Sequence, residues 1–220
     1  MSGPSPLLSA VVAESTSTRD RLLDAAARLF AERGIDNVSL AEIVRTAGQR
    51  NASAVHYHFG NRDDILRAVL GRHVPVIADR RRQLLREARA RPVDDVRAAA
   101  EAIVRPVTEF AQRGWREWAY LQIGSELSGA LTRAGPEIRD LMKQTDGHAA
   151  WRLLRDRCPG VAPDLWRVRR EICIVFIGRA AADRARALDS GGGGMVLSDD
   201  RFVDNLVDMV IGAMTAGGES

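Results

Sequence analysis

The stretch SLAEIVRTAGQRNASAVHYHF, residues 39–59, decides the fold that we expect for this chain. Ser39 and Glu42 have the Ser-x-x-Glu spacing of a capping box, in which each side chain accepts a hydrogen bond from the other residue's backbone N–H. A helix should therefore begin there, and Gly48 supplies the left-handed backbone that ends it after about two turns. Asn51 is a good N-cap for a second helix. Two short helices around a glycine-containing turn predict a helix-turn-helix.

The charges of this stretch favour a polyanion as partner. There is no acidic residue between Ile43 and Arg62, whereas side chains that reach phosphate oxygens and base edges gather there. These are Arg45, Arg50, Asn51, Ser53, His56, Tyr57, His58 and Arg62. The whole chain has a net charge of only +3, so this local patch would have to hold a nucleic acid. A solvated basic loop that binds nothing is the alternative.

Length and composition limit the class of protein. The chain has 220 residues and is 45% hydrophobic, enough for a sizeable core in one domain or in a small domain joined to a larger one. Cys158 and Cys173 lack the spacing of a disulfide framework or a redox pair, so we expect buried thiols and a reducing compartment. No apolar run approaches the roughly 18 residues that span a bilayer. We expect a soluble, cytoplasmic protein without a membrane partner.

Helical patterns cover the chain, and nothing alternates as strands do, so the predicted fold class is all-α. We interpret residues 1–17 as a disordered leader, because no basic residue precedes their apolar run. Residues 18–62 form an N-terminal three-helix unit whose first helix, 18–33, has Thr18 as its N-cap. Residues 63–220 form a larger helical domain.

Within the larger domain, a helix capped by Asn61 is expected to kink at Pro75, and Pro106 to kink another. The basic run at residues 80–82 is interpreted as a solvated helix face, with a second nucleic-acid patch as the alternative. Further helices are predicted over 93–112, 115–131, 136–157, 164–187 and 198–216.

The last two helices, 164–187 and 198–216, carry more apolar surface than one chain easily covers. Residues 172–177 are apolar all round, which predicts burial on every side. A symmetric homodimer that pairs these helices with their copies would bury the excess. Two ordinary core helices of a monomer are the alternative.

Aromatic residues in the middle of the chain are candidates for a small-molecule site. With a few polar residues between them, they would suit an apolar ligand that bears some polar groups. Packing of these aromatic residues in the core is the alternative, because the spacing is the same in both cases. The candidates are Trp115, Trp118, Tyr120, Gln122, Ser125, Glu126 and Trp151.

Catalysis and cofactors find no support in the sequence. His56 and His58 would point about 200° apart on a helix and have no acidic or cysteine partner nearby, so we expect no metal. We also find no nucleophile beside a base and no cofactor fingerprint, so we expect neither an enzyme nor a bound cofactor.

Residues 18–66 resemble the DNA-binding domain of the TetR family of bacterial transcriptional regulators. The resemblance is carried by LLDAAARLFAERG (22–34), VSLAEIVRTAG (38–48) and VHYHFGNRDDIL (55–66), in the family's order. It implies an all-α homodimer, a recognition helix near 51–59, a palindromic double-stranded DNA operator, and a pocket for an unknown small-molecule effector in the C-terminal helices.

The resemblance also implies roles for particular residues. Positions that contact phosphates match Ser39, Tyr57, His58 and Arg62, and positions that face the groove match Ser53 and His56. The chain has one residue more between Gly48 and Phe59 than the commonest form of the motif. The extra residue changes which family positions Arg50 and Asn51 correspond to, so their roles do not follow from the resemblance.

We therefore expect a ligand-responsive regulator, of the repressing kind that is commoner in the family, with the helix after Asn61 as the lever between effector and DNA. Two alternatives remain. One is a helical small-molecule-binding protein or enzyme whose N-terminal unit is only structural, and the other is an architectural DNA binder without an effector.

Overall fold

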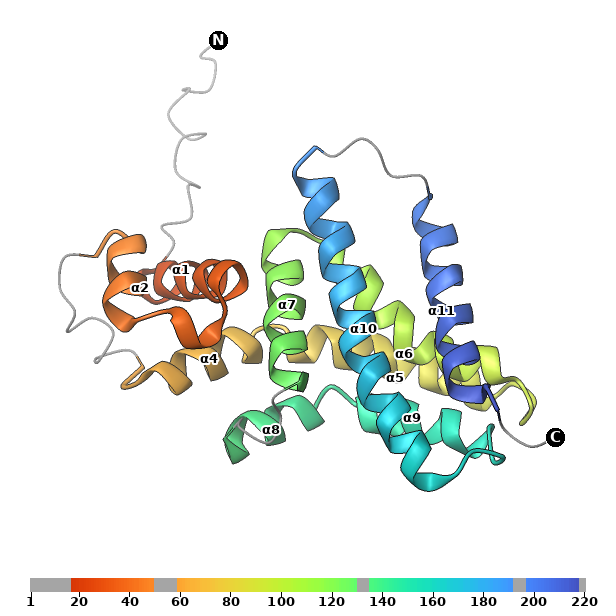
Figure 1. The fold of residues 1–220 in the computed structure, drawn as a ribbon. Helices are drawn as coiled ribbons and strands as arrows, with labels where there is room; N and C mark the ends of the chain where they lie inside the picture. The colour runs from red at the N-terminus through yellow and green to blue at the C-terminus, as the bar shows by residue number, and fades with distance from the viewer. Residues whose placement is uncertain (1–16, 50–58, 130–134, 192–196, 218–220) are drawn as a thin grey trace, which may run out of the picture.

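The computed structural model describes residues 17–49, 59–129, 135–191 and 197–217, and every regular element within these ranges is helical, as predicted (Figure 1). No helix in them is both long and apolar enough to cross a membrane. The elements are α1 (Thr18–Arg33), the 3-10 helix η1 (Ile35–Asn37), α2 (Leu40–Thr46), α4 (Arg62–Gly71), α5 (Val74–Arg89), α6 (Val96–Ala111), α7 (Trp115–Gly129), α8 (Pro136–Lys143), α9 (Gly147–Asp156), α10 (Pro163–Asp189) and α11 (Asp199–Thr215).

The capping box predicted at the start of α2 is present. Ser39 Oγ accepts a hydrogen bond from the Glu42 backbone N–H at 3.3 Å, and Glu42 Oε2 accepts one from the Ser39 backbone N–H at 2.9 Å. Gly48 follows with φ 68°, the left-handed conformation expected there. The cap of α1 differs from the prediction, because Ser17 accepts the capping bond at 3.1 Å and Thr18 is already helical.

The helix predicted to kink at Pro75 is two separate helices. Asn61 caps α4 as predicted, with its side chain accepting from the Asp64 N–H at 3.0 Å. However, α4 ends at Gly71 and α5 begins at Val74. Pro75 therefore lies in the first turn of α5, where its missing N–H leaves no helical hydrogen bond unmade.

The helix predicted over residues 136–157 is also divided in two. α8 ends at Lys143, and α9 begins at Gly147. Asp146 lies between them with φ 57°, a left-handed conformation that a continuous right-handed helix cannot contain. The prediction overlooked the Asp146-Gly147 pair, a dipeptide that favours turns, because helical patterns lie on both sides of it.

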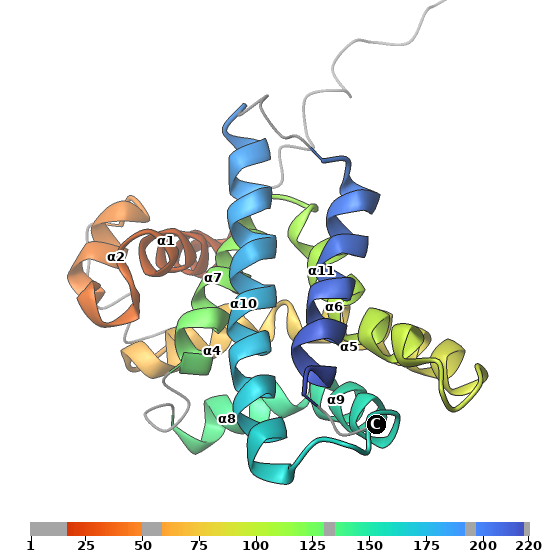
Figure 2. The same cartoon turned by 45° about the vertical axis from the view of Figure 1, so that its right-hand side comes forward.

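Two groups of buried side chains hold the helices together. One lies between α5, α6, α9, α10 and α11 and includes Leu154 and Met214. The other joins α1, α2 and α4 to α7 and α10 and includes Phe30, Ile65 and Ile123. This second group crosses the boundary predicted at residue 62, so the N-terminal unit shares its core with the larger domain, and Figures 1 and 2 show it resting against α7.

α10 and α11 lie next to each other on one face of the molecule (Figure 2). The predicted burial of residues 172–177 on every side is wrong for the single chain. Cys173 and Ile177 are buried, whereas Ile172 is 63% and Phe176 is 37% exposed. The reason is that α10 packs on α6, α7 and α11 through one face only. Cys158 and Cys173 are buried free thiols, as predicted.

Candidate functional site

The residues predicted to contact DNA are divided between described and undescribed parts of the chain. Ser39 and Arg62 are described, at the starts of α2 and α4. Arg50, Asn51, Ser53, His56, Tyr57 and His58 fall outside the described residues. The next described residue is Phe59, which is buried. The guanidinium carbon of Arg19 lies over its ring, 5.1 Å from the ring centroid.

The hydroxyl of Ser39 is committed to the capping box. Besides accepting from Glu42 N–H, Ser39 Oγ lies 2.9 Å from Glu42 Oε2, to which it donates. A hydroxyl has a single proton to donate. While the box is intact, this side chain has no proton left for a phosphate oxygen, so its predicted DNA contact would require Glu42 to release it.

Arg62 is better placed for a phosphate. It is the first residue of α4, and its Nη2 lies 3.4 Å from Asp36 Oδ1, a carboxylate that is itself highly exposed. Ion pairs of this kind are worth little in water. The guanidinium can therefore exchange Asp36 for a phosphate oxygen at small cost.

Two residues predicted to line an effector pocket instead attach α7 to the N-terminal unit. Glu126 Oε1 accepts the Ile35 backbone N–H at 3.0 Å, and the Trp115 ring lies 3.9 Å from the Arg28 guanidinium carbon. Trp118 packs against the shared core of the same junction, and Gln122 is partly buried on α7.

Ion pairs complete this junction. Arg116 of α7 binds the Asp24 carboxylate of α1 through Nε at 2.9 Å and Nη2 at 2.6 Å, and Arg72 reaches the same carboxylate at 3.1 Å. Burial opposes ionisation of Asp24, but the hydrogen bonds and charges of the two arginines outweigh it and lower its pKa below the ordinary value. The junction is thus held by apolar packing and by charge.

His73, between α4 and α5, lies behind the junction. Its ring centroid is 5.3 Å from that of Phe110 and 5.4 Å from that of Tyr120. Burial lowers the pKa of His73 to about 4, and the positive charges of Arg72 and Arg116 contribute in the same direction. The imidazole is therefore neutral at physiological pH.

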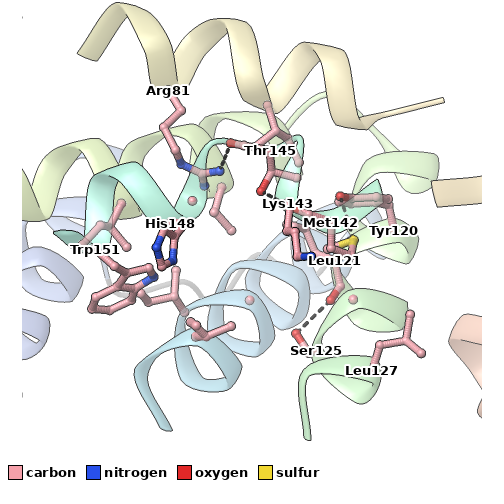
Figure 3. Close-up of a pocket in the computed structure, with 18 of the residues that line it drawn as sticks. Arg81, Tyr120, Leu121, Ser125, Leu127, Met142, Lys143, Thr145, His148 and Trp151 are labelled. Atoms are coloured by element: carbon pink, nitrogen blue, oxygen red, sulfur yellow. Dashed lines mark hydrogen bonds between the residues drawn. The ribbon is translucent and has the colours of Figure 1, made fainter. Parts of the chain in front are cut away.

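A cavity of about 440 Å³ lies inside the larger domain, among α5, α6, α7, α9 and α10 and the segment around α8 (Figure 3). This volume is within the roughly 300 to 1,000 Å³ of small-molecule sites. Of the residues predicted from the sequence, Tyr120, Ser125 and Trp151 line it. The other predicted residues, Trp115, Trp118, Gln122 and Glu126, are not part of its lining.

The wall between α7 and α10 is closely packed. Ser125 Oγ donates to the Leu121 carbonyl at 2.8 Å, and a Cβ added to Gly178 would overlap Ser125 Oγ. Burial raises the pKa of Tyr120, so its phenol stays protonated. The Tyr120 hydroxyl, whose partner is the weakly accepting Met142 sulfur at 3.9 Å, can therefore donate to a ligand, whereas the proton of Ser125 is committed to the Leu121 carbonyl.

Arg81 is the cavity residue that the sequence interpretation missed. The prediction of a solvated face at residues 80–82 is wrong for this side chain, which is only 5% exposed. Pro106 lies inside α6 and has no N–H, so the Ala102 carbonyl, four residues earlier, lacks its helical partner. Arg81 Nε donates to that carbonyl at 3.4 Å, and Nη1 donates to the Thr145 carbonyl at 2.5 Å (Figure 3 shows the latter).

The lining of the cavity is one-sided in charge. Arg81, Arg139, Lys143 and Arg170 contribute to it, whereas no Asp or Glu of the described chain does. Within the described ranges, no group of three His, Cys, Asp or Glu residues is placed to hold a metal ion. His56 and His58, for which no metal is expected from the sequence, lie outside those ranges.

Comparison with known proteins locates the strongest similarity in the N-terminal unit. Residues 22–69 match the family described as bacterial regulatory proteins, tetR family. Over 58 residues, 26% of this chain and 27% of the relative, the chain is 40% identical to the HTH-type transcriptional regulator SrpR of Pseudomonas putida. Over 60 residues, 27% of this chain and 28% of the relative, it is 38% identical to the HTH-type transcriptional repressor BepR of Brucella suis biovar 1 (strain 1330). The match spans about a quarter of these curated relatives.

Solved structures are similar over nearly the whole chain. Mycobacterium smegmatis AmtR has a TM-score of 0.53 at 17% identity, covering 94% of this chain and 90% of that one. The TetR family transcriptional regulator PfmR from Thermus thermophilus has a TM-score of 0.51 at 20% identity, covering 93% of this chain and 99% of that one. At such low identity, this similarity supports the fold alone.

Together, the fold and the comparisons describe a helical chain whose N-terminal unit is similar to that of HTH-type transcriptional regulators and whose larger part contains a cavity. Among such regulators, the similarity over residues 22–69 is to the TetR family of bacterial regulatory proteins.

Proposed function

We propose that the chain is a sequence-specific DNA-binding transcriptional regulator, a homodimer that represses from a palindromic operator and is released by a small-molecule effector. The observation that carries the proposal is the family match over residues 22–69, which includes the capped helix α2. A small-molecule-binding protein or enzyme with a merely structural N-terminal unit is not favoured, because the match lies in that unit. We propose no catalytic activity.

The exposed apolar side chains of α10 support the homodimer. Leu165, Val168, Ile172 and Phe176 are exposed and follow one another at intervals of three or four residues, so they form one stripe along the helix. Met209 of α11 is exposed as well. A second copy that packs residues 164–187 and 198–216 against the same residues of the first would bury the stripe around a two-fold axis.

In such a dimer, two recognition helices would enter successive major grooves roughly 34 Å apart. An effector weakens DNA binding if it binds better to a dimer with a different spacing, and this differential affinity alone sets the shift in population. α7 contacts both the cavity and the N-terminal unit, since Ser125 lines the cavity and Glu126 accepts a hydrogen bond from Ile35 of that unit. We therefore assign the lever to α7 in place of the helix after Asn61.

An electrophoretic mobility shift with the DNA upstream of the chain's own gene, repeated at rising salt, tests the proposal. Arg62→Ala should weaken binding to operator and random DNA alike and reduce the salt slope by about 1. Arg89→Ala, which removes an exposed arginine at the end of α5, is the matched control. Ser53→Ala should relax sequence preference. If the wild-type chain retards no DNA specifically at any salt concentration, the proposal is wrong.

A further inference from the structure

The cavity contains a positive charge for which the described chain provides no counter-ion. Arg81 is almost fully buried, and it forms no ion pair with any described carboxylate. The charge of Asp146 acts on Arg81 and raises its pKa, but this carboxylate is bound by Arg82 at 3.2 Å and does not line the cavity. Burial lowers the pKa of Arg81 to about 10, which leaves it protonated at neutral pH. An isolated buried charge is strongly unfavourable, and two carbonyl groups compensate for only part of the lost hydration.

The donors of Arg81 are only partly used. Its guanidinium has five N–H groups, and two of them donate to the Ala102 and Thr145 carbonyls. The side chain lines the cavity, and Figure 3 shows its guanidinium directed towards His148. The N–H groups of Arg81 that donate to no carbonyl group suit a carboxylate, which can accept two parallel N–H bonds from a guanidinium.

A second cation lines the cavity from another helix. Arg170 of α10 is half-buried, and its Nε is buried without a hydrogen-bond partner in the described ranges. The other two cations are exposed, and Lys143 is already neutralised by Asp140 at 2.7 Å. The uncompensated positive charge therefore belongs to Arg81 and Arg170.

The rest of the lining is apolar. Ile77, Ile103, Val107, Ile174 and Trp151 surround the space in front of the two arginines. Such a surface selects a molecule with a substantial hydrocarbon or aromatic body, because each CH₂ that it buries adds to the free energy of binding. A free inorganic anion would leave most of the cavity unused.

We propose that this cavity binds an organic carboxylate, with the carboxylate against Arg81 and Arg170 and an apolar body against the surrounding aliphatic and aromatic side chains. This inference rests on the proposed function, because it names the chemical class of the effector. It excludes the cationic amphiphiles that an acid-lined cavity of the same size would select.

The test uses matched ligand pairs and the full-length protein. Octanoate, decanoate, 4-phenylbutanoate and 2-naphthylacetate are each titrated beside the corresponding primary amide, by isothermal calorimetry and by tryptophan fluorescence, since Trp151 lines the cavity. In at least one pair, the carboxylate should bind about tenfold or more tightly than its amide. If no carboxylate binds, or if every amide binds as tightly as its acid, the inference is wrong.

Variants identify the groups responsible. Arg81→Met should remove the preference for the carboxylate, whereas Arg82→Met, which changes the adjacent residue outside the cavity, should keep it. Since Arg81→Met also removes two hydrogen bonds to carbonyl groups, its fold is checked by circular dichroism. Arg170→Met breaks no described hydrogen bond and should reduce the preference independently. If both cavity variants retain the full preference, the assignment is overturned.

A mobility shift in the presence of the same ligands separates this inference from the proposed function. Carboxylate binding without release of DNA would support the ligand class and contradict the regulation. Release of DNA only by the neutral amides would support the regulation and contradict the ligand class.

Discussion

Replacing Ile172 with Asp should turn the proposed dimer into monomers without unfolding them. Full burial of an Ile side chain contributes about 1.5–3 kcal/mol. In the single chain, 63% of this side chain is still exposed, so the dimer would gain about 1–2 kcal/mol from it. A two-fold axis presents Ile172 twice, which makes about 2–4 kcal/mol per dimer.

This free energy corresponds to a rise in the dimer dissociation constant of roughly 30-fold to 900-fold, and two facing or near-facing carboxylates would add to it. Sedimentation equilibrium over a dilution series measures the change. Thermal unfolding of the monomer should change little, because the replaced side chain is solvent-exposed there. Binding to a palindromic operator should weaken together with dimerisation.

Val93→Asp is the matched control, since Val93 is an 86% exposed aliphatic residue between α5 and α6, away from the proposed interface. It should leave the dissociation constant unchanged. The reasoning would be refuted by an Ile172→Asp protein that dimerises as tightly as wild type, or by a wild-type protein that stays monomeric at high concentration.

Three further predictions concern stability. Ser39→Ala removes the cap of α2 and should cost about 1 kcal/mol, which lowers the melting temperature in calorimetry by about 2–4 °C. Ser39→Asp can also cap the helix and should lower the melting temperature less. Equal melting temperatures for wild type and both variants would contradict this prediction. Gly178→Ala forces a methyl group against Ser125 Oγ and should lower the free energy of unfolding in urea by about 1–3 kcal/mol. Adding Ser125→Ala to the same chain should recover part of this loss. If the losses of the two single variants simply add in the double variant, the two residues do not interact. Because His73 binds its proton near pH 4 when folded and near 6.5 when unfolded, the folded state should lose at most about 3 kcal/mol as the pH falls between these values. His73→Phe should remove that part of the pH dependence, and an unchanged pH profile would show that another group causes it.

Much of the fold could be predicted because its signals are local. The capping box at Ser39, the Asn61 cap and the helical periodicity depend on residues a few positions apart, and the structure contains them. The turn at Asp146 was missed although Asp146-Gly147 is a dipeptide that favours a turn, because the helical patterns on both sides of it look continuous. Local propensity agrees with the structure there, and the helical periodicity of the longer segment did not show the break.

The site was less predictable because periodicity does not identify the neighbour that each face of a helix meets. α7 lies between the N-terminal unit and the cavity, so Glu126 and Ser125, adjacent in sequence, have different partners. Arg81 looked solvated beside Arg80 and Arg82. Its burial depends on a carbonyl left unpaired by Pro106, and a sequence read in order does not show that these two segments meet.

The core shared by α1, α4 and α7 restricts how this architecture can be recombined. A chimera joined near residue 62 would separate Ile35 from Glu126 and Asp24 from Arg116, and would expose the apolar face on which the N-terminal unit rests. Under the proposed function, a change of DNA specificity would therefore be obtained more readily by exchanging residues within 50–58 than by exchanging the whole unit. The proposed DNA-contacting residues and the cavity could then vary separately, provided that the junction between them is kept.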